Sequence, residues 1–286
     1  MKTKLQFVIQ KIRGQKHPIR FILSRVLWHS GLCSLFTTTL PVGIKIRFYP
    51  TSASASFWAD SSYSTNDANF INDLLTDGDT FIDVGANIGH LTLIGGKKVG
   101  YGNVIAIEPN PRIFSFLDKN IKLNDFNNIK TYNIALGETD AIANFLDNKS
   151  DEQNFLTKTG SIQVSVKCLD KIFQGDTVAL LKIDTEGYEL PVLKGALNTI
   201  SKTEVILFES CQRHFDRYGY STRDIIDFLT KNNFRVFQFL SERELQEVDH
   251  AHTSETCENL VAVQDVNIFK IRLNKEPRSY LVNMNP

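Results

Sequence analysis

Residues 81–90 read FIDVGANIGH, and this stretch decides the fold. Its first residues are apolar and end a predicted strand, and Gly85 and Gly89 form a turn before a predicted helix. Glycine lets a backbone approach a ligand closely, and a helix N-terminus offers free N–H groups. In open α/β sheets, ligands bind beyond the carboxyl ends of the strands. The turn therefore indicates a binding loop, with a tight structural turn as the alternative.

The glycine spacing separates two classes of ligand. A dinucleotide site would have the pattern G-x-G-x-x-G here, whereas three residues separate Gly85 from Gly89. Asp83 precedes the turn, where its carboxylate can organise the loop, face a cationic amino-acid group and repel a phosphate. The pattern favours a methyl-donor site over an NAD-dependent oxidoreductase, which remains the less favoured alternative.

Short apolar runs alternate with helical segments along the rest of the chain. The runs are Thr80–Val84, Val104–Ile107, Thr131–Ile134, Ala179–Ile183, Val205–Phe208, Phe234–Phe239 and Leu260–Val263. This rhythm predicts a doubly wound, mainly parallel α/β sheet with right-handed crossovers. The last two runs have no clear helix between them, so we expect an antiparallel hairpin there.

Helix signals lie between these runs and before them. Asn110 and Pro111 are typical of a helix cap and first turn, and further helices are expected over 69–75, 188–200 and 221–231. The segment 141–170 breaks the alternation. It predicts two extra strands, 144–146 and 162–168, around a mobile loop over Asp147–Gly160.

Acidic residues follow the predicted strands at three further places. Glu108 ends one strand, where a carboxylate can accept both hydroxyls of a ribose or simply cap a helix. Asp184 and Glu209 end the next two strands in the same way. Glu186 and Glu189 also suit a helix N-terminus electrostatically. The recurrence of acids at strand ends is too regular for a structural role alone, and it predicts a site.

Five stretches together resemble a known family. FIDVGANIGHLTL, NVIAIEPNP, NIALGE, LKIDTEGYELPVLKGA and VILFES, in order over roughly residues 78–240, resemble the FkbM-type methyltransferases of the class I S-adenosylmethionine fold. The resemblance implies a Rossmann-like sheet of seven strands with an antiparallel last strand. It also implies S-adenosylmethionine as cofactor and methylation of a hydroxyl oxygen, often on a sugar or glycan. Asn87 stands where most class I enzymes have glycine, as in this family's own variant.

The resulting site prediction divides the residues into two groups. The cofactor-binding residues are Asp83, Gly85, Asn87, Gly89, Glu108 and Asp184, and the catalytic residues are Asp184, Glu209 and His214. Asp184 would orient the acceptor hydroxyl and take its proton. Paired carboxylates at Asp184 and Glu209 would suit Mg²⁺, but no dense ligand motif supports it, so no metal is expected. A binding module without catalytic activity remains the main alternative.

The distribution of charge sets the N-terminal part of the chain apart. The whole sequence holds 32 basic and 32 acidic residues, yet residues 1–59 hold nine basic residues and no acid. We expect a basic arm over 1–59 with a helix and a strand at 43–49, a methyltransferase domain over 60–270, and a tail over 271–286. The arm is either a solvated extension or a contact for an anionic membrane surface, and no specific nucleic acid is expected.

The cysteines and apolar segments bear on location. Cys33, Cys168, Cys211 and Cys257 have neither zinc-site spacing nor the density of a disulfide framework, which favours a reducing compartment. No secretory signal and no apolar run of about 18 residues is present. We therefore expect a cytoplasmic protein, and the basic arm leaves open a peripheral position at the membrane.

Overall fold

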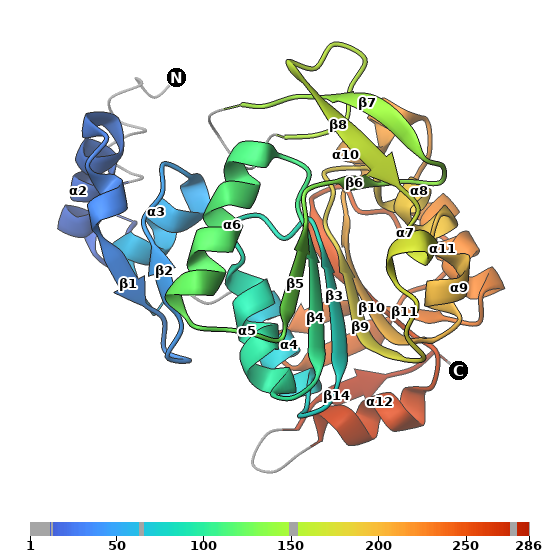
Figure 1. Ribbon diagram of the computed structural model, residues 1–286. Helices are drawn as coiled ribbons and strands as arrows, with labels where there is room; N and C mark the ends of the chain where they lie inside the picture. Colours follow the sequence, from blue (N-terminus) through green and yellow to red (C-terminus); the bar gives the residue numbers. More distant parts are fainter. Residues whose placement is uncertain (1–11, 13, 63–65, 149–153, 275–278, 286) are drawn as a thin grey trace, which may run out of the picture.

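The computed structural model of the protein, which describes residues 12, 14–62, 66–148, 154–274 and 279–285, is built around one large sheet (Figure 1). Nine strands lie in the order β14-β12-β11-β13-β10-β9-β3-β4-β5. They are β3 (Thr80–Val84), β4 (Asn103–Ile107), β5 (Ile129–Tyr132), β9 (Val178–Ile183), β10 (Thr203–Ser210), β11 (Arg235–Ser241), β12 (Glu244–Glu247), β13 (Glu258–Val263) and β14 (Leu281–Asn283).

All seven predicted runs contribute strands to this sheet. Neighbours from β5 through β10 pair in parallel, and β13 pairs antiparallel with both β10 and β11. The expected antiparallel pairing of the last two runs is therefore confirmed, although β12 lies between them in the chain, so they do not form a simple hairpin. The expected total of seven strands is wrong, because β12 and β14 extend the sheet beyond β11. β12 pairs antiparallel with β11, and β14 pairs in parallel with the other edge of β12.

The central strands are buried on both faces. Phe81 of β3 belongs to one hydrophobic cluster, whereas its neighbour Ile82 belongs to the cluster on the opposite face. Leu180 and Leu181 of β9 divide in the same way. Strands covered on both faces consist of nearly continuous apolar residues, which is why these runs were evident in the sequence.

Helices cover both faces of the sheet (Figure 1). They are α4 (Asn66–Leu74), α5 (His90–Val99), α6 (Pro111–Leu123), α7 (Leu169–Ile172), α8 (Glu189–Lys194), α9 (Leu197–Ile200), α10 (Gln212–Phe215), α11 (Thr222–Lys231) and α12 (Val266–Leu273), with a 3₁₀ turn at Asp216–Tyr218. The predicted cap of α6 is confirmed, because Asn110 Oδ1 accepts hydrogen bonds from the backbone N–H groups of Arg112 and Ile113. The helix expected over 188–200 is two short helices, since Gly195 and Ala196 interrupt it.

A three-stranded sheet lies near the carboxyl ends of the main strands (top of Figure 1). It consists of β6 (Ala135–Leu136), β7 (Ala141–Phe145) and β8 (Ile162–Lys167), in the order β6-β8-β7. The two extra strands predicted between 141 and 170 are thus confirmed as β7 and β8. Residues 149–153 of the loop predicted to be mobile lie outside the described residues.

The N-terminal segment folds onto the main domain. It contains α2 (Pro18–Ser30), a 3₁₀ turn at Cys33–Leu35, β1 (Thr37–Thr39), β2 (Lys45–Arg47) and α3 (Ser52–Ala59). The predicted strand is β2, and its partner is β1 rather than a strand of the main sheet. Ile44, Ile46 and Phe57 join the hydrophobic cluster under the main sheet, and the backbone N–H of Arg47 donates to Asn120 Oδ1 of α6. The second half of the predicted arm is therefore integral to the domain. Residues 1–11 and 13 lie outside the described part.

The C-terminal segment is also integral to the domain. The predicted boundary between residues 270 and 271 cuts through α12, whose Phe269 and Leu273 are buried in the main cluster. Tyr280 and Val282, beside and within β14, belong to the same cluster. Burial of these apolar side chains explains why the described part of the predicted tail is ordered as an edge of the sheet.

Candidate active site

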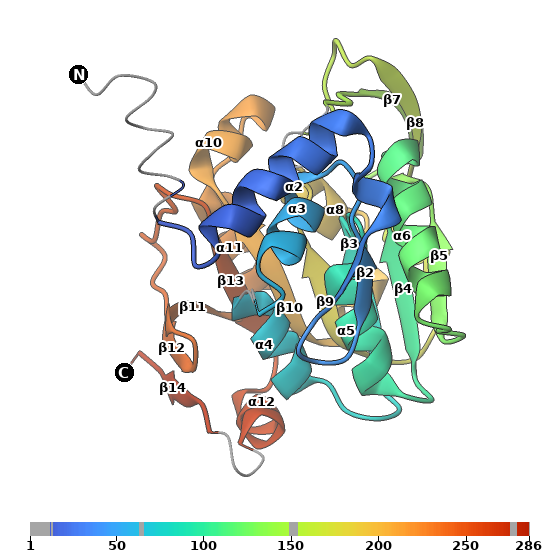
Figure 2. The same cartoon turned by 90° about the vertical axis from the view of Figure 1, so that its left-hand side faces the viewer.

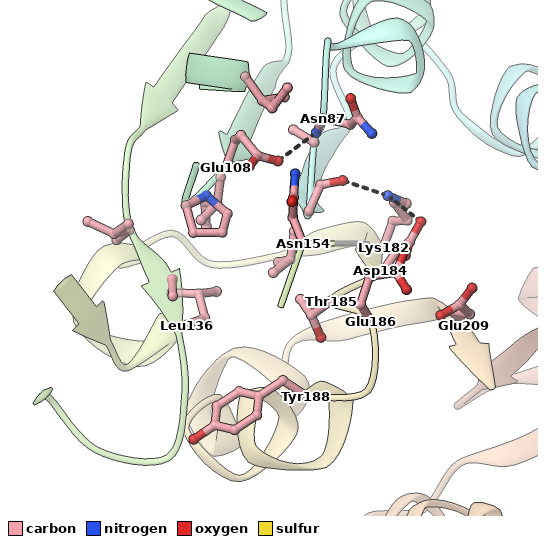
Figure 3. Close-up of a pocket in the computed structure, with 18 of the residues that line it drawn as sticks. Asn87, Glu108, Leu136, Asn154, Lys182, Asp184, Thr185, Glu186, Tyr188 and Glu209 are labelled. Atoms are coloured by element: carbon pink, nitrogen blue, oxygen red, sulfur yellow. Dashed lines mark hydrogen bonds and ion pairs between the residues drawn. The ribbon is translucent and has the colours of Figure 1, made fainter. Parts of the chain in front are cut away.

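A pocket of about 300 Å³ lies at the carboxyl ends of β3, β4, β9 and β10 (Figure 3). Three predicted acidic residues, Glu108, Asp184 and Glu209, line it together with Gly85 and Asn87. Parallel strands bring their carboxyl ends to one edge of the sheet, so residues far apart in the sequence meet there. The volume is at the lower end of the usual range for small-ligand sites.

The two glycines of the binding loop serve different contacts. Gly85 has φ of +79°, and an added Cβ would lie 1.8 Å from the backbone oxygen of Asp184. Gly89 has φ of +90° and precedes α5, where an added Cβ would lie 2.5 Å from Leu117 Cδ1. Gly85 therefore lets the loop approach β9 beside the pocket, whereas Gly89 lets α5 pack against α6.

Glu108 is held in place by the backbone on both sides. Its Oε2 accepts from the N–H of Asn87 and its Oε1 from the N–H of Asn110, each at 2.9 Å. Burial raises the pKa of this carboxyl to about 7, although the two N–H groups act in the opposite direction. Each oxygen keeps a lone pair for a further donor, so the group is oriented to receive two hydroxyls from the pocket.

Asp83 lies behind the loop, away from the pocket surface. Its side chain is fully buried, accepts a hydrogen bond from Thr92 Oγ1 at 2.6 Å and lies 3.3 Å from Lys182 Nζ. Asp83 was predicted to organise the loop and to face a cationic ligand group, and its position in the structure fits the first of these roles. It offers no exposed surface for the predicted contact with a cationic ligand group.

Lys182 is a member of the site that sequence reasoning missed. Its Nζ lies 3.3 Å from Asp83, 3.4 Å from Asp184 and 3.1 Å from the backbone oxygen of Gly85, to which it donates. Burial acts to lower the pKa of Lys182, but Asp83, Asp184 and Asp67 together raise it above its usual value. This buried cation ties the binding loop to β9. The sequence feature that could have indicated it is a single charged residue within an otherwise apolar strand.

Asp184 pairs with Lys182 from the solvent-exposed side. Its side chain is 42% exposed, in contrast to the fully buried Asp83 on the other side of Lys182. Figure 3 shows its carboxylate beside Lys182, between Glu108 and Glu209. Asp184 can therefore contact a ligand while Lys182 holds it in position.

Glu209 and His214 lie together at the far side of the pocket. His214 Nδ1 is 3.2 Å from Glu209 Oε2 and 3.5 Å from Glu186 Oε2. Burial, together with Asp184, Glu186 and Glu189, raises the pKa of Glu209 to about 9. Burial, Arg217 and Arg213 lower the pKa of His214, so its ring is neutral at neutral pH. The Glu209–His214 pair can exchange a proton with a bound hydroxyl. The ligand atoms of Glu186, Glu209 and His214 all lie within 4.8 Å of one another, so this group could also hold a divalent cation.

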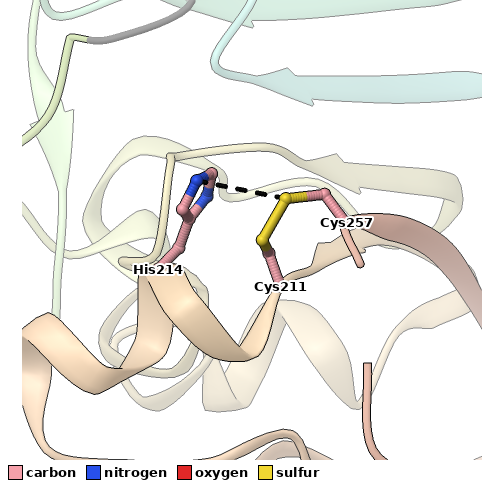
Figure 4. A group of neighbouring side chains, drawn as sticks. All are labelled: Cys211, His214 and Cys257. Carbon is pink, nitrogen blue, oxygen red and sulfur yellow. Dashed lines mark hydrogen bonds between the residues drawn. A yellow bond between two sulfur atoms is a disulfide. The ribbon is translucent and has the colours of Figure 1, made fainter. Parts of the chain in front are cut away.

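A disulfide supports the helix that carries His214 (Figure 4). Cys211, which precedes α10, is bonded to Cys257, 46 residues further along the chain and just before β13. His214 Nε2 lies 4.0 Å from Cys257 Sγ, opposite the ring nitrogen that faces Glu209. The sequence did not predict this pair, and Cys33 and Cys168 are the free thiols among the described cysteines.

A second hollow adjoins the pocket. Its lining includes Phe155, Arg213 and Arg217, and it shares Glu186 and Glu209 with the first pocket. The Arg217 guanidinium lies 4.2 Å from the centre of the Phe155 ring. One end of the combined site is therefore acidic and apolar, and the other is cationic and aromatic.

Comparison with known proteins matches residues 83–236 to the model of the methyltransferase FkbM domain. The chain belongs to the FkbM methyltransferase family. The match covers more than half of the sequence and includes every predicted site residue. It confirms the predicted family and with it S-adenosylmethionine as the cofactor of the domain.

Two curated relatives each match part of this chain. Methyltransferase 1 of Beauveria bassiana is 33% identical over 146 residues, which cover 41% of this chain and 58% of that protein. Hexuronic acid methyltransferase AglP of Haloferax volcanii is 30% identical over 142 residues, which cover 46% and 55%. The chain thus matches a little over half the length of each relative. A solved S-adenosylmethionine-dependent O-methyltransferase of Thermotoga maritima aligns with a TM-score of 0.43 and 15% identity, over 71% of this chain and 66% of its own.

Proposed function

We propose that this chain transfers a methyl group from S-adenosylmethionine to a hydroxyl oxygen of a sugar that carries a carboxylate. The observation behind the proposal is the junction of the two hollows at Glu186 and Glu209, which line both. A donor in the first pocket and an acceptor in the second would meet at these residues. Transfer between two bound molecules requires such alignment.

The residues of the first pocket fit the donor. Glu108 has lone pairs for two ribose hydroxyls, and Ile107, Pro109 and Leu136 supply an apolar lining for a base. Asp184 offers an exposed carboxylate for the cationic part of the molecule. A dinucleotide would instead bring phosphates close to these carboxylates, which is electrostatically unfavourable.

The acidic residues also have a place in the chemistry. Bound S-adenosylmethionine supplies a methyl group on a positively charged sulfur. Asp184, held by Lys182, would orient the acceptor hydroxyl toward that methyl group. The hydroxyl proton would pass to the Glu209–His214 pair as the new carbon–oxygen bond forms, because this pair lies at the junction and shares a hydrogen bond.

The second hollow suits an acidic sugar. Arg213 and Arg217 offer guanidinium groups that match the geometry of a carboxylate, and the Phe155 ring supports the Arg217 guanidinium in the hollow. One relative is named a hexuronic acid methyltransferase, which supports the same class of acceptor.

The test uses a matched pair of acceptors, a glucuronoside and the corresponding glucoside. The product is detected by mass after incubation with S-adenosylmethionine. We expect methylation of the glucuronoside to be favoured, and the double variant Arg213→Gln/Arg217→Gln to lower kcat/KM for it by about 10- to 100-fold, the equivalent of about 1.5–3 kcal/mol for hydrogen bonds to charged groups. Arg223→Gln is the control, because Arg223 lies on α11 outside the hollow.

Calorimetry checks the donor separately. S-adenosylhomocysteine should bind and NAD should not. Binding of NAD, or the absence of a methylated product from every hydroxyl acceptor in the presence of bound donor, would contradict the proposed reaction. Equal methylation of the glucuronoside and the glucoside would contradict only the proposed preference for an acceptor with a carboxylate, and not the proposed methyl transfer.

A further inference from the structure

Helix α2 carries an apolar stripe on its outer side. Ile19, Ile22, Leu23 and Val26 are all exposed, Ile19 at 75% and Val26 at 58%. Their spacing of three and four residues places them on one face of the helix. The opposite side faces the protein: Ser24 is buried, and Trp28 packs against a small cluster around Phe48.

The apolar surface continues past the end of the helix. Leu32, Leu35 and Phe36, in the turn after α2, are also exposed. Figure 2 shows α2 lying lengthwise on the surface of the molecule, over α3. Exposed apolar side chains grouped in this way mark surfaces that contact another apolar phase or partner.

Two arginines flank this stripe. Arg20 and Arg25 lie on either side of it, given about 100° of rotation per residue. Their guanidinium groups are held near aromatic rings, Arg20 over Trp58 at 5.1 Å and Arg25 over Trp28 at 5.5 Å. The sequence from residue 1 to residue 59 has nine basic side chains and no acidic one.

We propose that α2 and the turn after it dock on an anionic membrane surface. The stripe would enter the boundary between headgroups and acyl chains, and the cations would contact the lipid phosphates. Within the described residues, no helix combines the length and apolar character needed to cross a bilayer, so the contact is interfacial. A second copy of the chain is the less suitable occupant, because self-association through α2 would oppose two segments that are basic and lack acids.

The test is sedimentation of the full-length chain with vesicles of phosphatidylcholine, with and without phosphatidylglycerol. We expect binding to the anionic vesicles at low salt, little binding to the neutral ones, and release as salt rises, because salt screens exposed charges. The double variant Ile19→Gln/Val26→Gln should lower the partition coefficient by about tenfold or more, since two apolar side chains lose their burial.

A matched control is available on the other side of the molecule. Ile271 of α12 is 71% exposed, almost as much as Ile19, and α12 lies far from α2 in both ribbon views. Ile271→Gln should therefore bind vesicles as the wild type does. Calorimetry with S-adenosylhomocysteine should give unchanged affinity in both variants, which shows that they are folded.

Three results would overturn the membrane proposal. They are no sedimentation of the wild type with anionic vesicles at low salt, equal sedimentation of the Ile19→Gln/Val26→Gln variant, and self-association in vesicle-free solution that this variant abolishes. The last result would assign the stripe to a second copy of the chain. The proposal does not depend on the proposed methyl transfer, because each readout is binding.

Discussion

Glu108 is a buried glutamate and Glu209 a half-buried one, both near the ends of parallel strands, and their surroundings differ. Glu108 accepts hydrogen bonds from two backbone N–H groups, and its pKa rises to about 7. Burial, together with the nearby carboxylates of Asp184, Glu186 and Glu189, raises the pKa of Glu209 to about 9. Glu108 is thus fixed as an acceptor of hydrogen bonds, whereas Glu209 retains a proton that it can exchange. In the proposed reaction, the same sequence signal therefore gives a binding group in one case and a proton-transfer group in the other.

Asp184 lies between these two regions, and its substitution should have the largest effect. Asp184→Asn keeps the shape of the side chain but removes the charge with which it would orient the acceptor hydroxyl and contact the donor. We expect a melting temperature close to the wild type, donor affinity weaker by about 1.5–3 kcal/mol because the cationic part of the donor loses its carboxylate, and turnover at saturating donor lower by about 10²- to 10⁴-fold because the acceptor hydroxyl is no longer aligned. An early melting temperature together with normal turnover would show that Asp184 only stabilises the start of a helix.

Lys182 connects Asp184 to the buried Asp83, so its removal should affect stability. Lys182→Met leaves Asp83 buried without its cation, and we expect a loss of about 3–5 kcal/mol in the free energy of unfolding. Chemical denaturation measures this loss. Adding Asp83→Asn should recover part of the stability, because the Asn side chain can still accept the Thr92 hydrogen bond. No recovery in the double variant would show that the ion pair is not the cause.

The raised pKa of Glu209 predicts that the wild type and the Glu209→Gln variant differ in the pH dependence of kcat/KM. A carboxyl group with a pKa of about 9 holds its proton at pH 7, so the form of Glu209 that can accept a proton grows about tenfold per pH unit up to pH 9. The value of kcat/KM should therefore rise by up to about a hundredfold between pH 7 and pH 9. The profile of Glu209→Gln should be flat over this range. The same rise in the variant would assign the ionisation to another group.

The sequence predicted the central sheet well because buried parallel strands are continuous apolar runs. It also predicted that Glu108, Asp184 and Glu209 would meet, since parallel strands end at one edge of the sheet. The pairing of Lys182 was missed, because a lone lysine in an apolar strand does not indicate its partners. The orientation of Asp83 away from the pocket depends on Thr92 and Lys182, which the sequence could not place beside it.

The edges of the molecule were less predictable. β14 is a three-residue segment that becomes a strand only through its pairing with β12. Cys211 and Cys257 are 46 residues apart, and the antiparallel pairing of β10 with β13, in which Ser210 lies opposite Glu258, brings them together. β2 had the alternation of a half-buried strand, but that pattern does not specify β1 as its partner. Tertiary pairing therefore decides the parts of the fold that carry weak local signals.

A side-by-side comparison of Glu108→Gln and Glu209→Gln tests the division of roles most directly. Donor affinity is measured by calorimetry with S-adenosylhomocysteine, and turnover is measured at saturating S-adenosylmethionine with one glucuronoside acceptor. We predict that Glu108→Gln weakens donor binding by about 1.5–3 kcal/mol and keeps most of its turnover, since only the binding contact is altered. Glu209→Gln should bind the donor as the wild type does and lose about 10²- to 10⁴-fold in turnover. The same pattern of loss in both variants would contradict the account.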